Sequence, residues 1–208
     1  MRTPLRQTAG VVAAAVLALA SGLWHPASAA AGRAAPDTAA ALDRVQVDRA
    51  DLTPPPAPVV GGVQLRGTWL GPYTFRNARA GKCLDIEGAS TASLAPAVQY
   101  NCVAGGVSQM WWEWKTEGDG FIYFRLLGNA HSQLCLHADG RNIPIKQVRC
   151  TTLPNQVFYT KSENLHQIAS DLNGECMEIQ GGSPDNFARI VLWPCHGQSH
   201  QVWYKYAV

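Results

Sequence analysis

Three similar units make up most of this chain, and they constrain its fold more than any other feature. Each unit has a cysteine inside an apolar, strand-like run, a second cysteine at the end of another such run, and a closing Gln-x-aromatic motif. The motif glutamines are Gln109, Gln156 and Gln201, so the period is about 45 residues. Units of this size cannot bury their own apolar faces and must pack on one another. Because there are only three, we expect them to close around a threefold axis.

The strand signals in these units are short and are separated by turn residues. Apolar runs such as residues 190–193 (IVLW) alternate with Gly- and Pro-containing clusters such as residues 181–184 (GGSP). No stretch here keeps a helical periodicity beyond about two turns. We therefore expect residues 65–208 to form one all-β domain.

The first 29 residues have the features of a secretory signal peptide. Arg2 and Arg6 precede an apolar run at residues 11–20, and a small-x-small cleavage site (ASA) ends at residue 29. The run is too short to span a bilayer, and no later run approaches the roughly 20 apolar residues required. We expect residues 1–29 to be removed and the protein to be secreted into the extracellular space without a membrane span. The alternative is a retained N-terminal anchor.

Residues 30–64 are rich in Ala and Pro and contain a Pro-Pro-Pro-Ala-Pro run. Such a run is extended and acts as a semi-rigid spacer. We expect this segment to be a disordered linker. The alternative is a short helix over residues 38–52, which would be marginal alone. If residues 36–64 become ordered, we expect them to do so against a partner protein.

The charge balance argues against a polyanionic partner. Removing the signal peptide lowers Lys+Arg from 17 to 15, which equals Asp+Glu. The basic residues are spread through all three repeats, whereas nucleic-acid binding needs them clustered. Nucleic acid is therefore not an expected partner.

The six cysteines fall two per repeat, and the signal peptide implies an oxidising compartment in which disulfides form. Although six cysteines allow 15 connectivities, the repeat selects one pairing within each unit. The expected disulfides are Cys83–Cys102, Cys135–Cys150 and Cys176–Cys195. Each closes a loop that should contribute roughly 3 kcal/mol in the chain-entropy treatment.

The ordered recurrence of Cys-Leu-Asp-like, aromatic-x-Cys and Gln-x-Trp elements resembles the ricin-B-type β-trefoil lectins and covers all of residues 65–208. The resemblance implies a β-trefoil with pseudo-threefold symmetry, in which a six-stranded barrel is capped by three hairpins. It also implies that the aromatic residues of the motifs, Trp111, Phe158 and Trp203, are buried near the axis.

Sugar binding needs a carboxylate and an amide for the hydroxyl groups and an exposed ring for the C–H face. By resemblance, the carboxylate lies two residues after the first cysteine, the ring two before the second, and an Asn beside the motif Gln. In the first repeat these positions are Asp85, Tyr100, Ser108 and Gln109; in the third they are Glu178, Trp193, His200 and Gln201. In the second they are His137, Val148, Asn155 and Gln156, which lack both carboxylate and ring. We predict binding pockets in the first and third repeats only.

Each of these residues also has a purely structural interpretation. Asp85 and Glu178 could be strand-end carboxylates bonded to a turn, and Tyr100 and Trp193 could pack on the neighbouring disulfides. Ser108 and His200 stand where the family has Asn, and so could be solvated loop residues. For the same reason the family's sugar preference does not carry over to this chain.

Nothing in the sequence indicates catalysis. The chain has no nucleophile-elbow, zinc-protease or phosphate-loop motif. Asp85 and Glu178 lie in different repeats, which argues against a glycosidase pair. The cysteine spacings are not those of a zinc site, so we expect no metal and no cofactor.

Two functions from different classes remain. The first is a secreted carbohydrate-binding protein. The alternative is a non-catalytic, cell-binding or scaffolding subunit of a secreted complex, which resembles the use of ricin-type trefoils in cytolethal distending toxins. A protease-inhibitor trefoil is a weaker third possibility, because no loop carries an inhibitory motif.

Overall fold

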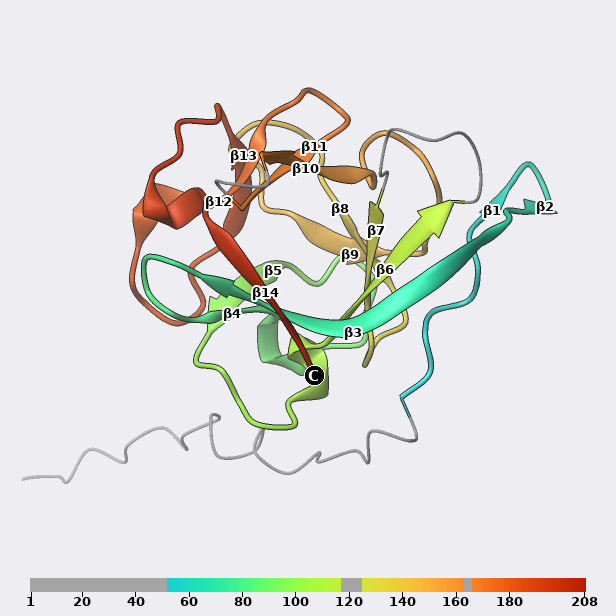
Figure 1. Cartoon of the computed structure of the whole chain (residues 1–208), viewed down its shortest axis with the longest axis horizontal. Coiled ribbons are helices and arrows are strands. Elements are labelled where there is room, and N and C mark those ends of the chain that lie inside the picture. The colour runs from blue at the N-terminus through green and yellow to red at the C-terminus, as the bar shows by residue number, and fades with distance from the viewer. Residues whose placement is uncertain (1–51, 117–124, 163–165) are drawn as a thin grey trace, which may run out of the picture. The chain divides into compact units, whose positions relative to one another are not determined.

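The computed structural model describes residues 52–116, 125–162 and 166–208 (Figure 1). The predicted signal peptide and residues 30–51 of the predicted linker, with nearly all of the alternative helix, lie outside these ranges. Within them, no helix is long and apolar enough to cross a membrane.

Each repeat contributes four consecutive strands. The first repeat has β3 (Gly67–Asn77), β4 (Cys83–Ile86), β5 (Ala97–Tyr100) and β6 (Trp111–Thr116). The second has β7 (Arg125–Asn129), β8 (Cys135–His137), β9 (Lys146–Val148) and β10 (Phe158–Ser162), and the third has β11 (Gln167–Ser170), β12 (Cys176–Ile179), β13 (Ile190–Trp193) and β14 (Trp203–Ala207). Short 3-10 turns lie between them: η3 (Glu87–Ala89), η4 (Val107–Gln109), η5 (Gln180–Gly182) and η6 (Ser199–Gln201). A hairpin of β1 (Val59–Val60) and β2 (Val63–Gln64) comes first, and the described residues contain no α-helix.

The first and last strands of the three repeats form a six-stranded barrel. Antiparallel pairing joins β14 to β3, β3 to β6, β6 to β7, β7 to β10 and β10 to β11. The barrel closes between β11 and β14, where Gln167 and Val202 form an antiparallel bridge and Trp203 N donates to His166 O at 3.0 Å. The two inner strands of each repeat form a cap hairpin: β4–β5, β8–β9 and β12–β13. The all-β trefoil predicted from the repeats is confirmed.

The aromatic residues of the three Gln-x-aromatic motifs lie in the centre of the core. Trp111 and Phe158 are fully buried and Trp203 is 2% exposed, and all three belong to one hydrophobic cluster. The indole nitrogens of Trp111 and Trp203 donate to Leu84 O and Met177 O, each at 3.1 Å. These bonds satisfy the polar atom of each ring while its apolar surface packs against the other repeats. The predicted core positions are confirmed.

The predicted disulfides are also confirmed: Cys83–Cys102, Cys135–Cys150 and Cys176–Cys195. In each cap hairpin the first cysteine pairs in register with a residue two positions before the second, as Cys83 does with Tyr100. The disulfide therefore fixes the end of the hairpin next to the candidate pocket.

Buried amide side chains join the cap hairpins of neighbouring repeats. Gln99 Nε2 in the first repeat donates to Ser183 O and Asp185 O in the third, each at 2.8 Å. The equivalent Gln147 Nε2 in the second repeat donates to Ser90 O and Ala92 O in the first, at 2.8 and 2.9 Å. In the third repeat the equivalent residue is Leu192, whose carbonyl accepts a hydrogen bond from Asn142 N at 3.0 Å. Two of the three boundaries thus have a buried side-chain amide, and the third has a leucine.

Residues 52–64, the last part of the predicted linker, pack on the domain. Gln133 Nε2 donates to Thr53 O at 2.9 Å, and Pro55 lies over Gly128, where an added Cβ would come within 2.6 Å of Pro55 Cγ. Ala57 joins a second hydrophobic cluster around Trp114. A rigid, extended proline segment has little entropy to lose on binding, and Gly128 leaves room for it. Residues 52–64 thus make specific contacts with the domain that follows them.

We predict that Trp203→Ala will lower the free energy of unfolding by about 3 to 5 kcal/mol, because it removes a buried indole. Trp193→Ala is the matched control, since that ring is 38% exposed and should cost about 1 kcal/mol at most. Urea denaturation with the disulfides intact measures both. A larger loss for Trp193→Ala than for Trp203→Ala would contradict the assignment of Trp203 to the core and of Trp193 to the surface.

Candidate functional site

An open pocket of about 480 Å³ lies in the third repeat, beside the β12–β13 hairpin and the η6 turn. Its lining residues are Asn142, Glu178, Gln180, Gly181, Val191, Trp193, His196 and His200. Glu178 pairs with Val191 across the hairpin, which places its carboxylate under the pocket. Three predicted site residues, Glu178, Trp193 and His200, therefore line this pocket, and Gln201 donates a hydrogen bond to Glu178.

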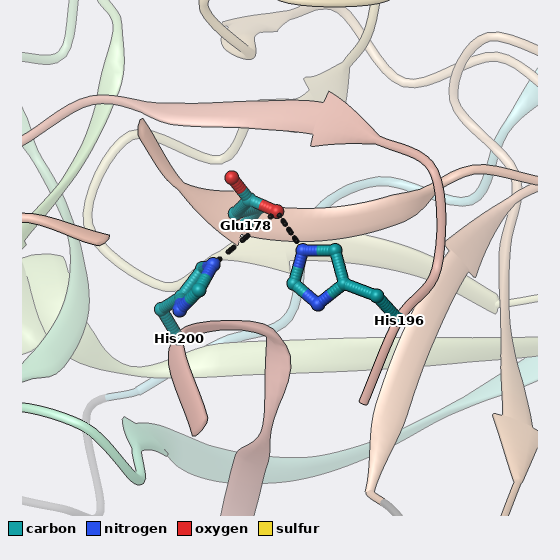
Figure 2. Close-up of side chains that lie close together, drawn as sticks. All are labelled: Glu178, His196 and His200. Atoms are coloured by element: carbon teal, nitrogen blue, oxygen red, sulfur yellow. Dashed lines mark hydrogen bonds and ion pairs between the residues drawn. The ribbon is translucent and has the colours of Figure 1, made fainter. Parts of the chain in front are cut away.

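The carboxylate of Glu178 is the centre of the polar contacts. It is 5% exposed, and its Oε2 accepts a hydrogen bond from Gln201 Nε2 at 2.7 Å. The Nε2 atoms of His196 and His200 lie 3.0 and 3.6 Å from the same oxygen. Figure 2 shows both imidazole rings pointing at this carboxylate. One buried acidic oxygen is thus surrounded by one amide and two imidazoles.

Gln201 is fully buried and holds the chain around the second cysteine of the repeat. Its Nε2 also donates to Pro194 O at 3.0 Å, and its Oε1 accepts from His196 N at 2.9 Å. Since these partners occupy its amide, Gln201 orients Glu178 and the loop that carries His196.

Trp193 forms the apolar wall of the pocket. Its ring is 38% exposed, whereas Ile190 and Leu192 on the same strand are fully buried. The exposed ring and the buried carboxylate of Glu178 line the same pocket.

His196 is the residue that the sequence analysis missed. It was not among the predicted positions, although it stands four residues before His200, and this His-x₃-His spacing could have drawn attention to it. The two ring centroids lie 5.0 Å apart. His196 thus adds a second imidazole to the site.

His200 occupies the position where the family has Asn, and it is 9% exposed. Burial lowers its pKa below the ordinary value; nearby Glu178 opposes this shift, and His196 and Arg79 add to it. Its Nδ1 has no hydrogen-bond partner among the described residues. The ring therefore favours the neutral form.

The carboxylate of Asp85 in the first repeat is similarly buried. Gln109 Nε2 donates to its Oδ2 at 2.8 Å and Ile86 N to its Oδ1 at 2.7 Å. Burial raises the pKa of Asp85 above its ordinary value, while hydrogen bonds from Gln109, Ser108 and Ile86 and the charge of His131 oppose the increase. Asp85, Ser108 and Gln109 are thus brought together.

Tyr100 is placed differently from the expectation of an exposed ring. It is 8% exposed because Phe187 from the third repeat packs on it, with ring centroids 4.9 Å apart. Phe187 is itself 43% exposed. The exposed ring beside Tyr100 is therefore that of Phe187, which no repeat motif predicts.

The second repeat has its own polar contacts at the equivalent place. His137 Nε2 lies 2.9 Å from Asp139 Oδ1 and 3.4 Å from Asn155 Nδ2. A hydrogen bond from Lys146 lowers the pKa of Asp139, with a smaller contribution from His137. The nearest carboxylate is therefore already paired within the protein.

The trefoil topology, the three disulfides and the buried Gln-x-aromatic motifs fit one family. The sequence profile of the ricin-type beta-trefoil lectin domain matches residues 71–203. The chain belongs to this family. The matched residues run from the middle of β3 to the start of β14, so they include both predicted pockets.

Solved structures share the fold at low sequence identity. The designed threefold-symmetric protein ThreeFoil is 22% identical over 65% of this chain and 98% of its own, with a TM-score of 0.59. The C-half of an earthworm R-type lectin, solved in complex with GalNAc, is 17% identical over 66% of this chain and 99% of its own, with a TM-score of 0.54. An exo-β-1,3-galactanase from Clostridium thermocellum is 22% identical over 66% of this chain, but only 30% of the enzyme is covered (TM-score 0.60). Among curated proteins, no sequence matches.

We predict that Ser108→Ala will raise the pKa of Asp85 further, because it removes a hydrogen bond that favours the charged form. Carboxyl ¹³C NMR across a pH titration measures this shift, with Ser90→Ala as a control on the same repeat. An Asp85 resonance that titrates at the same or lower pH in Ser108→Ala would contradict a stabilising hydrogen bond from Ser108 to the Asp85 carboxylate.

The same raised pKa sets the pH dependence of stability. Native Asp85 holds its proton to a higher pH than Asp85 in the unfolded chain does. Its contribution to the free energy of unfolding is therefore greatest at pH values below the ordinary pKa, and it declines as the pH rises through the folded pKa. Ser108→Ala should move the end of this decline to higher pH, which urea unfolding at several pH values can follow.

Proposed function

We propose that this lectin-family protein binds glycans through pockets in its first and third repeats. The observation that carries the proposal is the pocket of the third repeat, where the exposed ring of Trp193 stands beside the buried carboxylate of Glu178. The carboxylate can accept a hydrogen bond from a sugar hydroxyl while the indole packs on the C–H face. Membership of the ricin-type lectin family supports the same class of ligand.

The first repeat offers a related arrangement with a different ring. Asp85 supplies the carboxylate, Ser108 replaces the amide of the family pattern, and Phe187 supplies the exposed ring because it covers Tyr100. We propose this as the second, weaker pocket. The second repeat has no role in the proposal, since Asp139 is already paired with His137 and Lys146.

The role proposed is binding and not catalysis. Asp85 and Glu178 belong to cap hairpins of different repeats, and each is held by its own motif glutamine. We also propose that the protein acts outside the cytoplasm. The three disulfides support this location because such bonds persist in oxidising compartments.

We predict two binding events of about −4 to −5 kcal/mol each for a matched monosaccharide, as expected of shallow pockets. Calorimetry on the mature chain should give a stoichiometry near two, which falls to one in either Trp193→Ala or Asp85→Asn. Avidity for a polymeric glycan should fall much further in each variant, because both pockets must be engaged at once.

His137→Ala is the matched control, since it alters the second repeat and should leave the stoichiometry at two. Far-UV spectra and melting temperatures confirm that each variant is folded. A stoichiometry of zero across a broad glycan panel would remove the proposal.

A second candidate function is that of a subunit that binds another protein. The β1–β2 hairpin favours it, because its three valines, Val59, Val60 and Val63, are exposed and lie within the predicted partner-binding segment, residues 36–64. Among the similar folds are a mosquitocidal holotoxin and a cytolethal distending toxin. Replacing all three valines with Ser should abolish co-purification with a protein that binds this hairpin, and it should leave glycan binding unchanged.

A further inference from the structure

Three potential metal ligands converge in the third repeat. Glu178 Oε2 lies 3.0 Å from His196 Nε2 and 3.6 Å from His200 Nε2, and the three ligand atoms are all within 4.8 Å of one another. Figure 2 shows the carboxylate above and the two rings below it, with both dashed contacts ending on the same carboxylate oxygen. We propose that Glu178, His196 and His200 form a binding site for a divalent cation of the zinc class. This inference goes beyond glycan binding and does not depend on it.

The distances fit such an ion with small movements of the side chains. Zinc binds imidazole nitrogen at about 2.0–2.1 Å and carboxylate oxygen at about 2.0–2.2 Å, so ligand atoms in a tetrahedral site are about 3.3–3.5 Å apart. The observed separations of 3.0 and 3.6 Å from Glu178 Oε2 lie on either side of this value. The two imidazole nitrogens lie within 4.8 Å of each other and would come to a similar separation as the ion binds.

The ligand types select the kind of metal. Two imidazoles and one carboxylate suit Zn²⁺ and its neighbours Co²⁺, Ni²⁺ and Cu²⁺, whereas Ca²⁺ and Mg²⁺ prefer sites made of oxygen. The fourth position would open into the pocket beside Trp193, where water or another ligand can complete the coordination.

The charges around Glu178 set it apart from the other buried glutamates. Glu113 pairs with Lys205 at 3.0 Å, and Glu175 pairs with Arg141, so each faces a permanent cation. Among the described residues, the ion partners of Glu178 are the two histidines alone. A bound divalent cation would supply the positive charge that this buried carboxylate lacks.

The surrounding contacts hold all three ligands in place. Gln201 bonds both the carboxylate of Glu178 and the backbone N–H of His196. Asn77 Nδ2 donates to the carbonyl of His200 at 3.1 Å. Such supporting bonds position metal ligands before the ion arrives.

Two contacts limit the affinity. Gln198 N donates to His196 Nδ1 at 3.2 Å, and this bond must be given up when Nδ1 takes the ring proton so that Nε2 can bind metal. The positive charge of Arg79 also acts on His200, where it opposes a bound cation. We therefore expect a dissociation constant in the micromolar range.

The test is calorimetric titration of the mature chain, without a histidine tag or glycan, with ZnCl₂ near neutral pH. We expect one Zn²⁺ per chain, a rise in melting temperature, and visible absorption bands typical of a tetrahedral site when Co²⁺ is used. His196→Ala should weaken Zn²⁺ binding at least about tenfold and remove the rise in melting temperature. His196 is the chosen position because its partly exposed side chain can be removed without disturbing the core.

Two controls separate this site from other histidines and from the sugar pocket. His137→Ala removes a histidine of the second repeat, and Trp193→Ala removes the ring proposed to stack on sugar; both should bind Zn²⁺ as the wild type does. No binding by the wild type, or equal binding by His196→Ala, would overturn the proposal. Either result leaves glycan binding untouched, just as an absence of glycan binding leaves the Zn²⁺ titration valid.

Discussion

One buried glutamine amide in each repeat fixes the chain on both sides of the second cysteine. The side-chain Nε2 donates to the carbonyl before that cysteine, and Oε1 accepts from the N–H after it. The three sets are Gln109 with Asn101 and Val103, Gln156 with Arg149 and Thr151, and Gln201 with Pro194 and His196. Because the aromatic residue two positions later enters the core, the same glutamine links the surface loop to the barrel. A side-chain amide suits this role, because its NH₂ group and its carbonyl oxygen are separate groups that can bond both sides of the cysteine at once.

The remaining donor of the glutamine explains why the repeats differ in chemistry. In the first and third repeats it reaches a carboxylate, Asp85 or Glu178, and holds it beneath the surface. The extra methylene of Glu178 carries its oxygen toward the loop with His196 and His200, whereas the shorter Asp85 stays close to Ser108. A change of one methylene and of two neighbouring residues, Ser108 to His200 and Val103 to His196, therefore separates a hydroxyl-lined pocket from an imidazole-lined one.

The repeat made the fold and the disulfides predictable, because every residue that it specifies contacts others of the same unit or of the common core. Trp111, Phe158 and Trp203 are examples. The missed features arise between units or outside them. Phe187 covers Tyr100 from another repeat, and residues 52–64 pack on Gly128 from beyond the periodic region. His196 could be found from the sequence, because it stands four residues before His200, but it belongs to none of the repeat motifs.

The unequal boundaries between repeats have a consequence for the pocket of the third repeat. At two of the boundaries, the buried amides of Gln99 and Gln147 donate to the neighbouring repeat. At the boundary between the second and third repeats, Leu192 takes this position, and an exposed hydrogen bond runs from Gln180 Nε2 to Asn142 Oδ1 at 3.0 Å. Both of these polar residues line the pocket. The pocket thus lies at the boundary between the second and third repeats, where Leu192 stands in place of a buried glutamine. A ligand bound there would contact both repeats and stabilise the boundary between them. Local opening of the domain at this boundary would then become rarer as the pocket is occupied.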